Sequence, residues 1–383
     1  MQTHESVFGD CNDDAGVFDI GRMAERLLLF ERVVLRSARL SELPVLAQAF
    51  GGQRLTKLLN SRALALDCTP YALGNVELSP LRYRIISSQS KDPAKATDFY
   101  GRIRRKFPES MRRVDRLRLE NAVFQRSLVM PPDDFLRPAL RGVQKDVLAN
   151  VPGLKKAALL ATKEVTGKEL PSEALELRFY QEGDDDFVAE TNLVKLGVSE
   201  QDAHVIGRSA LFALTRTEQK LEQMRAFKAI CDFRESELDI LIERVNLAWK
   251  ESDSSADADR LSRVLRLKGF PDFSAAAKRG HVDYAKLLDV RESDGCRRFR
   301  AWLRDVDERT DEHLQEEMNS VLPAIAAVAE QPYMKPVKFA LTKLGVPGAL
   351  LSAIGYVSKK PLKAATALAF LDDAVGSILG DKS

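Results

Sequence analysis

Cysteine and histidine are scarce in this chain, with four of each among 383 residues. The cysteines lie far apart and form no CxxC pair, which argues against a disulfide framework and favours a reducing compartment. The histidines show no HExxH motif and no zinc spacing with a cysteine. The usual zinc motifs are therefore excluded.

The phosphate-binding loops of common nucleotide enzymes are also missing. No GxxxxGK[ST] motif occurs, and Gly167-Lys168 is followed by Glu169. No GxGxxG turn stands at a strand-to-helix junction, and the segment 207–211 lacks the second glycine of a nucleophile elbow. The sequence therefore predicts no cofactor and offers no recognisable catalytic motif.

Long apolar runs and a strong charge of one sign are absent as well. The longest uncharged run near the C-terminus, Leu344–Ser358, has 15 residues, short of the roughly 20 that a membrane-spanning helix needs. The first twenty residues are acidic instead of basic and apolar, so we expect a cytoplasmic protein. The net charge of +2 excludes capture of nucleic acid by the whole surface but permits a local basic patch.

What is present is an ordinary globular composition, 45% hydrophobic and 30% charged. Residues 32–37 and 63–68 read as buried strands on either side of a helical segment, 41–60, interrupted at Gly51-Gly52. That spacing is long enough for a crossover between parallel strands. Residues 81–87 form a third candidate strand, and two β-prone runs across a Gly/Asp turn predict a hairpin near 175–193.

The rest of the chain has helical periodicity. Ser199 opens a long helix that extends toward Cys231, and 238–249 is the clearest amphipathic segment. We predict a mostly α protein with a small N-terminal α/β unit containing a short parallel sheet, one β-hairpin and a helical C-terminal region. The predicted divisions are an α/β unit over 1–90, a helical body with the hairpin over 91–250, an acidic linker over 251–259 and a helical region with an Ala/Gly-rich tail over 260–383.

The most basic segment is Gly101–Arg126, where nine Arg or Lys residues stand against three acids. Val114, Leu117 and Phe124 are spaced to face a core, which would leave an arginine stripe outside. Such a stripe contacts phosphates by charge, and the partner would be nucleic acid or an acidic protein. The alternative is a solvated helix face paired with acids of the same chain. The candidate polyanion-binding residues are Arg105, Arg112, Arg113 and Arg116.

A second candidate site is acidic. Several aspartates follow the first residues of the chain, and another ends the second predicted strand. Carboxylates at the carboxyl edge of a parallel sheet can hold a divalent metal, although a calcium loop is excluded because Ala15 stands where that loop needs glycine. Helix capping by solvated acids is the alternative. The weak metal candidates are Asp10, Asp13, Asp14 and Asp67.

The C-terminal tail is the third feature. Residues 335–380 combine Ala/Gly-rich apolar runs with flanking lysines, a pattern that suits an anionic membrane surface or a buried helical hairpin. An oligomer is compatible with the sequence, but no pattern indicates one. The leading hypothesis is a non-enzymatic interaction or regulatory protein that engages a polyanion through its Arg-rich helix. The alternatives are a membrane-acting protein and a metal-dependent hydrolase or nuclease.

Overall fold

The fold is known from a computed structural model of the chain. The structure describes residues 6–9, 11–12, 17–37, 40–89, 106–107, 111–231, 234, 236–237, 239–241, 243–244, 262–304, 311–329, 334–342 and 355–356.

A parallel sheet forms the centre of the N-terminal part. Its strands are β1 (Ser6–Gly9), β2 (Arg32–Arg36), β3 (Leu64–Asp67), β6 (Ser127–Leu128) and β9 (Ile230–Cys231). They lie in the order β6-β3-β2-β1-β9, all parallel. The predicted parallel pairing of 32–37 with 63–68 is confirmed, and strands from much later in the chain complete the sheet.

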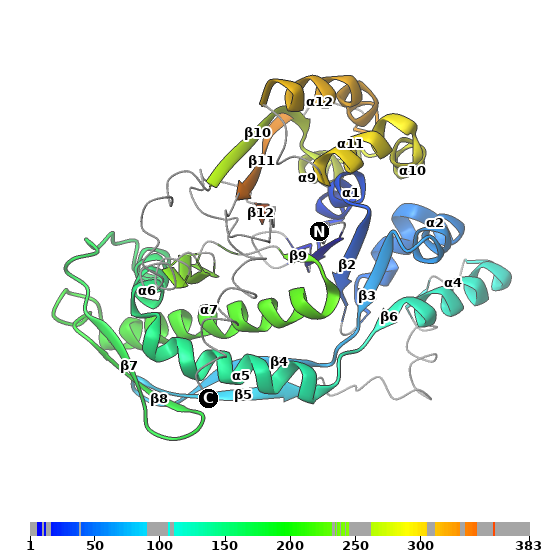
Figure 1. Cartoon of the computed structure of the whole chain (residues 1–383). Coiled ribbons are helices and arrows are strands. Elements are labelled where there is room, and N and C mark those ends of the chain that lie inside the picture. The colour runs from blue at the N-terminus through cyan, green and yellow to red at the C-terminus, as the bar shows by residue number, and fades with distance from the viewer. Residues whose placement is uncertain are drawn as a thin grey trace, which may run out of the picture.

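Three crossover helices cover one face of this sheet: α1 (Ile20–Leu29), α2 (Leu43–Asn60) and α4 (Arg113–Arg126) (Figure 1). The Asp19 carboxylate accepts hydrogen bonds from the backbone N–H groups of Gly21 and Arg22, which explains why α1 begins there. Val33 and Leu35 of β2 point into the core under these helices, whereas Val34 points to the opposite face.

The opposite face packs against α5 (Pro132–Ala149) and the second half of α7 (Glu200–Phe227). Phe8 of β1 stacks on Phe227 of α7 with ring centroids 5.4 Å apart. The long helix predicted from Ser199 is confirmed, and the Ser199 hydroxyl accepts a hydrogen bond from the backbone N–H of Asp202 at 3.0 Å.

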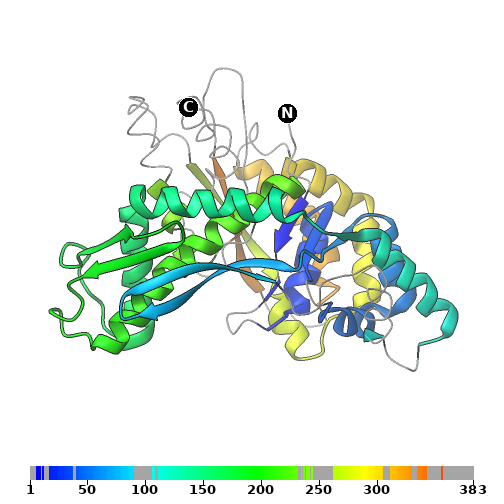
Figure 2. The same ribbon diagram turned by 90° about the horizontal axis from the view of Figure 1, so that it is seen from below.

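The predicted hairpin is formed by β7 (Leu177–Gln181) and β8 (Asp186–Thr191). It does not stand alone, because β8 pairs with β5 (Arg82–Gln89), and β5 pairs with β4 (Tyr71–Ser79). This antiparallel sheet packs with α5, the first half of α7 and α6 (Val151–Thr166) around a separate core. Figure 2 shows the long β4–β5 ribbon reaching from the parallel sheet to this second layer.

The C-terminal helices lie over α1: α9 (Phe273–Lys278), α10 (Tyr284–Glu292), α11 (Asp294–Arg304) and α12 (Asp311–Ala326) (Figure 1). The region is helical as predicted, but not throughout. An antiparallel sheet, β10 (Ser262–Pro271), β11 (Met334–Thr342) and β12 (Gly355–Tyr356), was not foreseen. The β-branched and aromatic residues of β10 and β11 lie about 70 residues apart, so their pairing is invisible to local periodicity.

Several predictions fall wholly or largely outside the described residues. The acidic linker 251–259 does, as does most of the amphipathic segment 238–249 and most of the tail 335–380. Among the helices that the structure describes, none combines the length and apolarity required to cross a bilayer.

Candidate anion-binding surface

The predicted basic helix exists as α4, but the side that it exposes to solvent is not the side expected from the spacing of its apolar residues. Val114, Leu117 and Phe124 were expected to face a core, yet their exposed fractions are 58%, 45% and 43%. Leu119, Ala122 and Val123 form the buried side instead. The error in phase arose because helix α4 is too polar for its few apolar residues to define one stripe.

Four exposed arginines and one half-buried arginine lie on α2 and α4, two helices that pack side by side, and Arg54 and Arg112 line one pocket there. We call this set the basic face, and it consists of Arg54 from α2 together with Arg112, Arg113, Arg116 and Arg118 from α4 and its N-cap. Of the candidates named from sequence, Arg112, Arg113 and Arg116 are in the set, and Arg105 lies outside the described residues.

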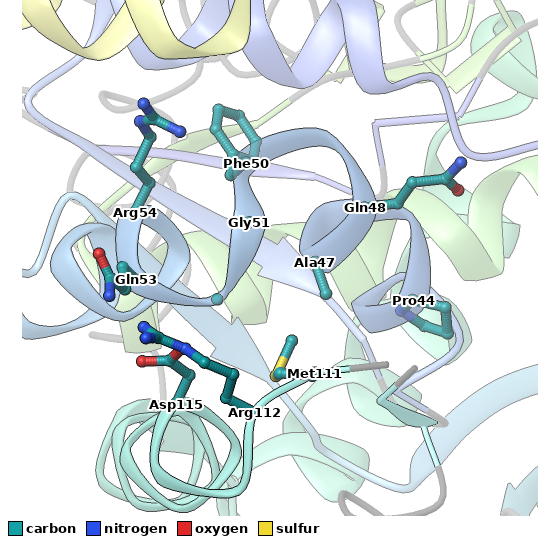
Figure 3. A pocket seen from close by; sticks show the side chains of 11 residues that line it. Pro44, Ala47, Gln48, Phe50, Gly51, Gln53, Arg54, Met111, Arg112 and Asp115 are labelled. Atoms are coloured by element: carbon teal, nitrogen blue, oxygen red, sulfur yellow. The ribbon is translucent and has the colours of Figure 1, made fainter. Parts of the chain in front are cut away.

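A pocket of about 900 Å³ opens at this face. Its wall on one side is the break in α2, where Gly51 has φ 71 and ψ 158. The opposite wall is Met111, Arg112 and Asp115 at the start of α4, as Figure 3 shows. The left-handed φ of Gly51 is readily adopted only by a residue without a Cβ atom, so the glycine noted in the sequence as a helix break opens the pocket. The full lining is Pro44, Ala47, Gln48, Phe50, Gly51, Gly52, Gln53, Arg54, Met111, Arg112 and Asp115.

The charges around the pocket are poorly compensated. The guanidinium Nε of Arg112, whose side chain is 73% exposed, lies 2.7 Å from the carboxylate of Asp115. This hydrogen bond lowers the pKa of Asp115, so that carboxyl group stays ionised. Within the described part of the chain, Arg54 and Arg113 form no pair with any carboxylate. An anion from outside would therefore meet available guanidinium groups.

The acidic candidate site is only partly described. Asp67 is fully buried at the end of β3 and accepts hydrogen bonds from the Thr69 N–H at 3.0 Å and from Gln223 Nε2 at 3.2 Å. Burial raises the pKa of Asp67, and the charge of Arg36 opposes that rise. Among the residues that the structure describes, no three His, Cys, Asp or Glu side chains could share a metal ion. Asp10, Asp13 and Asp14 lie outside them, so the metal site stays a prediction.

The structure also contains a buried ionic cluster that sequence reasoning missed. Glu218 of α7 and Asp146 of α5 are buried beside Arg244, which forms ion pairs with both carboxylates. Arg244 is shared between these two acids, whereas Glu222 pairs with Arg225. Burial raises the pKa of Glu218 to about 8, and the neighbouring Asp146 adds to the rise while Arg244 opposes it.

A second buried ionic cluster joins α7 to Glu237, which comes after β9 in the chain. The carboxylate of Glu237 lies 2.6 Å from Lys220 Nζ and 2.8 Å from Arg216 Nε. Burial alone would raise the pKa of Glu237, but these two cations lower it overall. Between Thr215 and Gln223, α7 therefore carries a polar layer whose charges are satisfied inside the protein.

Comparison with protein-family models, with curated proteins and with solved structures finds no match for this chain. Function must therefore be inferred from the geometry of the molecule itself.

Proposed function

We propose that this protein binds a polyanionic partner through the basic face, and that it does so without carrying out a chemical reaction on it. The observation that carries the proposal is the pocket of about 900 Å³ in a face whose Arg54 and Arg113 pair with no carboxylate of the described residues. A cytoplasmic location belongs to the same proposal.

Nucleic acid is the polyanion that suits this surface best. Arginines on α4 alternate with exposed apolar side chains, Val114, Leu117 and Phe124. Guanidinium groups contact phosphates, and apolar or aromatic side chains support bases by stacking, so the mixture matches a single strand better than it matches a purely acidic peptide. Acidic protein is the competing partner.

The test is fluorescence anisotropy with a labelled single-stranded oligonucleotide and the full chain at low salt. A variant with Arg54, Arg112, Arg113 and Arg118 changed to Gln should bind at least about tenfold more weakly, since hydrogen bonds to charged groups contribute roughly 1.5–3 kcal/mol each. Helical content from circular dichroism should stay unchanged because these four side chains are exposed.

A matched control variant removes an equal number of positive charges, four, from positions outside the basic face. Arg137, Lys145, Arg178 and Lys195 are exposed and lie on α5, β7 and the loop before α7, away from the pocket. Changing these four to Gln should leave affinity within about twofold, because only remote charges are lost. Equal weakening by both variants would show a non-specific charge effect and refute the assignment of the site. Stronger binding of a polyglutamate peptide than of the oligonucleotide would assign the acidic-protein partner instead.

A further inference from the structure

Three arginines meet at the opposite end of the α2–α4 pair, where the parallel strands begin. Arg32 is the first residue of β2, Arg62 lies two residues before β3, and Arg126 is the residue before β6. These strands are neighbours in the sheet, with Val33 beside Leu64 and Leu66 beside Ser127. Arg32 and Arg62 therefore start from the edge of the sheet, whereas Arg126 lies beside β3 about two residues further along.

Backbone contacts tie the three positions together. The backbone N–H of Val33 donates to the carbonyl of Ala63 at 2.8 Å, which holds the start of β2 against the turn that carries Arg62. Arg126 Nε and the backbone N–H of Arg62 each lie 3.1 Å from the carbonyl oxygen of Leu59. The side chain of Arg126 and the backbone of Arg62 thus share one acceptor at the end of α2, which places the two residues close together.

No carboxylate of the described structure compensates this group. Glu31 is adjacent to Arg32 in sequence, but its carboxylate binds Arg300 at 3.0 Å. Arg32 Nε is buried and has no hydrogen-bond partner. Burial lowers the pKa of Arg32, and the charges of Arg62 and Arg126 lower it further. Arg32 therefore lies within electrostatic reach of two further cations, and its buried Nε donor is unused.

The C-terminus of α2 supplies only part of the missing negative charge. A helix end is equivalent to roughly half an elementary charge, concentrated on its last carbonyl groups. One of those carbonyls, that of Leu59, already accepts from Arg126 and Arg62. More than two positive charges remain, which is the charge that a phosphate group of about −1.5 to −2 would balance.

We propose that Arg32, Arg62 and Arg126 form a binding site for a phosphate group, either free or carried as a terminal monoester. Guanidinium forks match the oxygens of a phosphate by paired hydrogen bonds, and three of them can surround a tetrahedral anion. The site is separate from the basic face: the 14 residues of α4 place Arg113 and Arg126 about 20 Å apart at 1.5 Å per residue. It does not depend on the proposed function.

The first experiment measures thermal stability of the full chain in increasing inorganic phosphate, with sodium chloride at matched ionic strength as reference. A ligand that binds only the folded state raises the melting temperature in step with the logarithm of its concentration. We expect that rise for phosphate and not for chloride. Arg62→Gln, which changes an exposed side chain, should weaken the apparent phosphate affinity about tenfold or more, and Arg32→Gln likewise.

Arg178→Gln is the matched control, since it removes one exposed arginine of β7 that belongs to neither proposed surface and should leave phosphate affinity unchanged. A second arm compares oligonucleotides with and without a 5′-phosphate. Tighter binding of the phosphorylated form, lost in Arg62→Gln, assigns a carried phosphate, whereas equal binding assigns free phosphate. The proposal is refuted if phosphate stabilises no more than chloride, or if both arginine variants keep the wild-type affinity. Failure of unphosphorylated oligonucleotide binding would refute only the proposed function.

Discussion

Two charge-rich helical segments of this protein differ in burial: one is exposed to solvent and the other is buried. Helix α4 exposes Arg113 and Arg118, and its apolar residues Val114 and Leu117 share the same solvent-facing side. The segment Thr215–Gln223 of α7 looks just as hydrophilic in sequence, yet most of its side chains are buried. The difference is that α7 lies between two apolar cores, one under each sheet, whereas α4 lies at the margin of one core (Figure 2).

This contrast shows that a charged residue in a sequence does not reveal whether its oppositely charged partner lies within the fold or in a ligand. Glu218 and Glu237 meet cations across chain separations of 26 and 17 residues. At the start of α4, Arg112 pairs with Asp115, and Arg113 pairs with no carboxylate of the described residues. Buried charges are matched within the fold because an unmatched one costs several kcal/mol, while exposed arginines remain available to a ligand.

The largest expected effect comes from breaking the buried cluster. Arg244→Met leaves Glu218 and Asp146 buried without their shared cation, and should lower the free energy of unfolding by about 3–5 kcal/mol. Urea unfolding followed by circular dichroism measures it. Adding Glu218→Gln to Arg244→Met should recover part of the loss. A loss below about 1 kcal/mol would show that the cluster is open to water.

The second prediction concerns pH. The pKa of Glu218 is about 8 in the folded state and near 4.5 when unfolded, so between these values the folded state holds a proton that the unfolded state has released. Stability therefore falls as pH rises through this window, by about 3 kcal/mol from pH 5 to pH 7.5. Asp146, Glu222, Arg225 and Arg244 face this carboxyl group. Glu218→Gln should flatten the dependence of the unfolding free energy on pH, measured by urea unfolding at several pH values. An unchanged slope would show that other groups cause the pH dependence.

A smaller effect tests how α5 accommodates the same carboxylate. A Cβ atom on Gly142 would overlap Glu218 Oε2, whereas one on Gly74 would meet no atom within 4 Å. Gly142→Ala should cost about 1–3 kcal/mol because the buried carboxylate must move. Gly74→Ala is the control and should cost less than about 1 kcal/mol. Equal costs in urea unfolding would mean that the contact between α5 and α7 is loose.

The smallest effect on the free energy of unfolding is expected for an exposed arginine of α4. Arg113→Gln removes a charge that no carboxylate of the described residues pairs with, so stability should change by less than about 0.5 kcal/mol. Differential scanning calorimetry of the wild type and the variant measures this. A clear destabilisation would place Arg113 in a structural ion pair and remove it from the proposed binding surface.

Much of the fold could be predicted because its signals are local. The strands at Arg32–Arg36 and Leu64–Asp67 are short β-branched or apolar runs. The start of the long helix α7 is indicated by its N-cap residue, Ser199. Strand Ser127–Leu128 and strand β9 are only two residues long, and they complete the sheet through pairing across more than 60 residues. Periodicity cannot detect such elements.

The candidate site was predictable in part for the same reason. Arg112, Arg113 and Arg116 follow from the density of charge along one helix. The Gly51-Gly52 break in α2 was also visible in the sequence, but the pocket beside it was not predicted. Arg54 joins them only because α2 and α4 pack side by side. The triad of Arg32, Arg62 and Arg126 depends on β2, β3 and β6 being neighbours in the sheet, which no spacing in the sequence encodes.

The salt dependence of oligonucleotide binding is the most direct test of the basic face. For the wild-type chain, the logarithm of the association constant should fall linearly with the logarithm of salt concentration, with a slope of about −0.7 per phosphate contacted. Changing Arg54, Arg112, Arg113 and Arg118 to Gln should make that slope shallower by about three, whereas the four-charge control on α5, β7 and the loop before α7 should leave it unchanged. Equal slopes for the two variants would contradict binding at the α2–α4 junction.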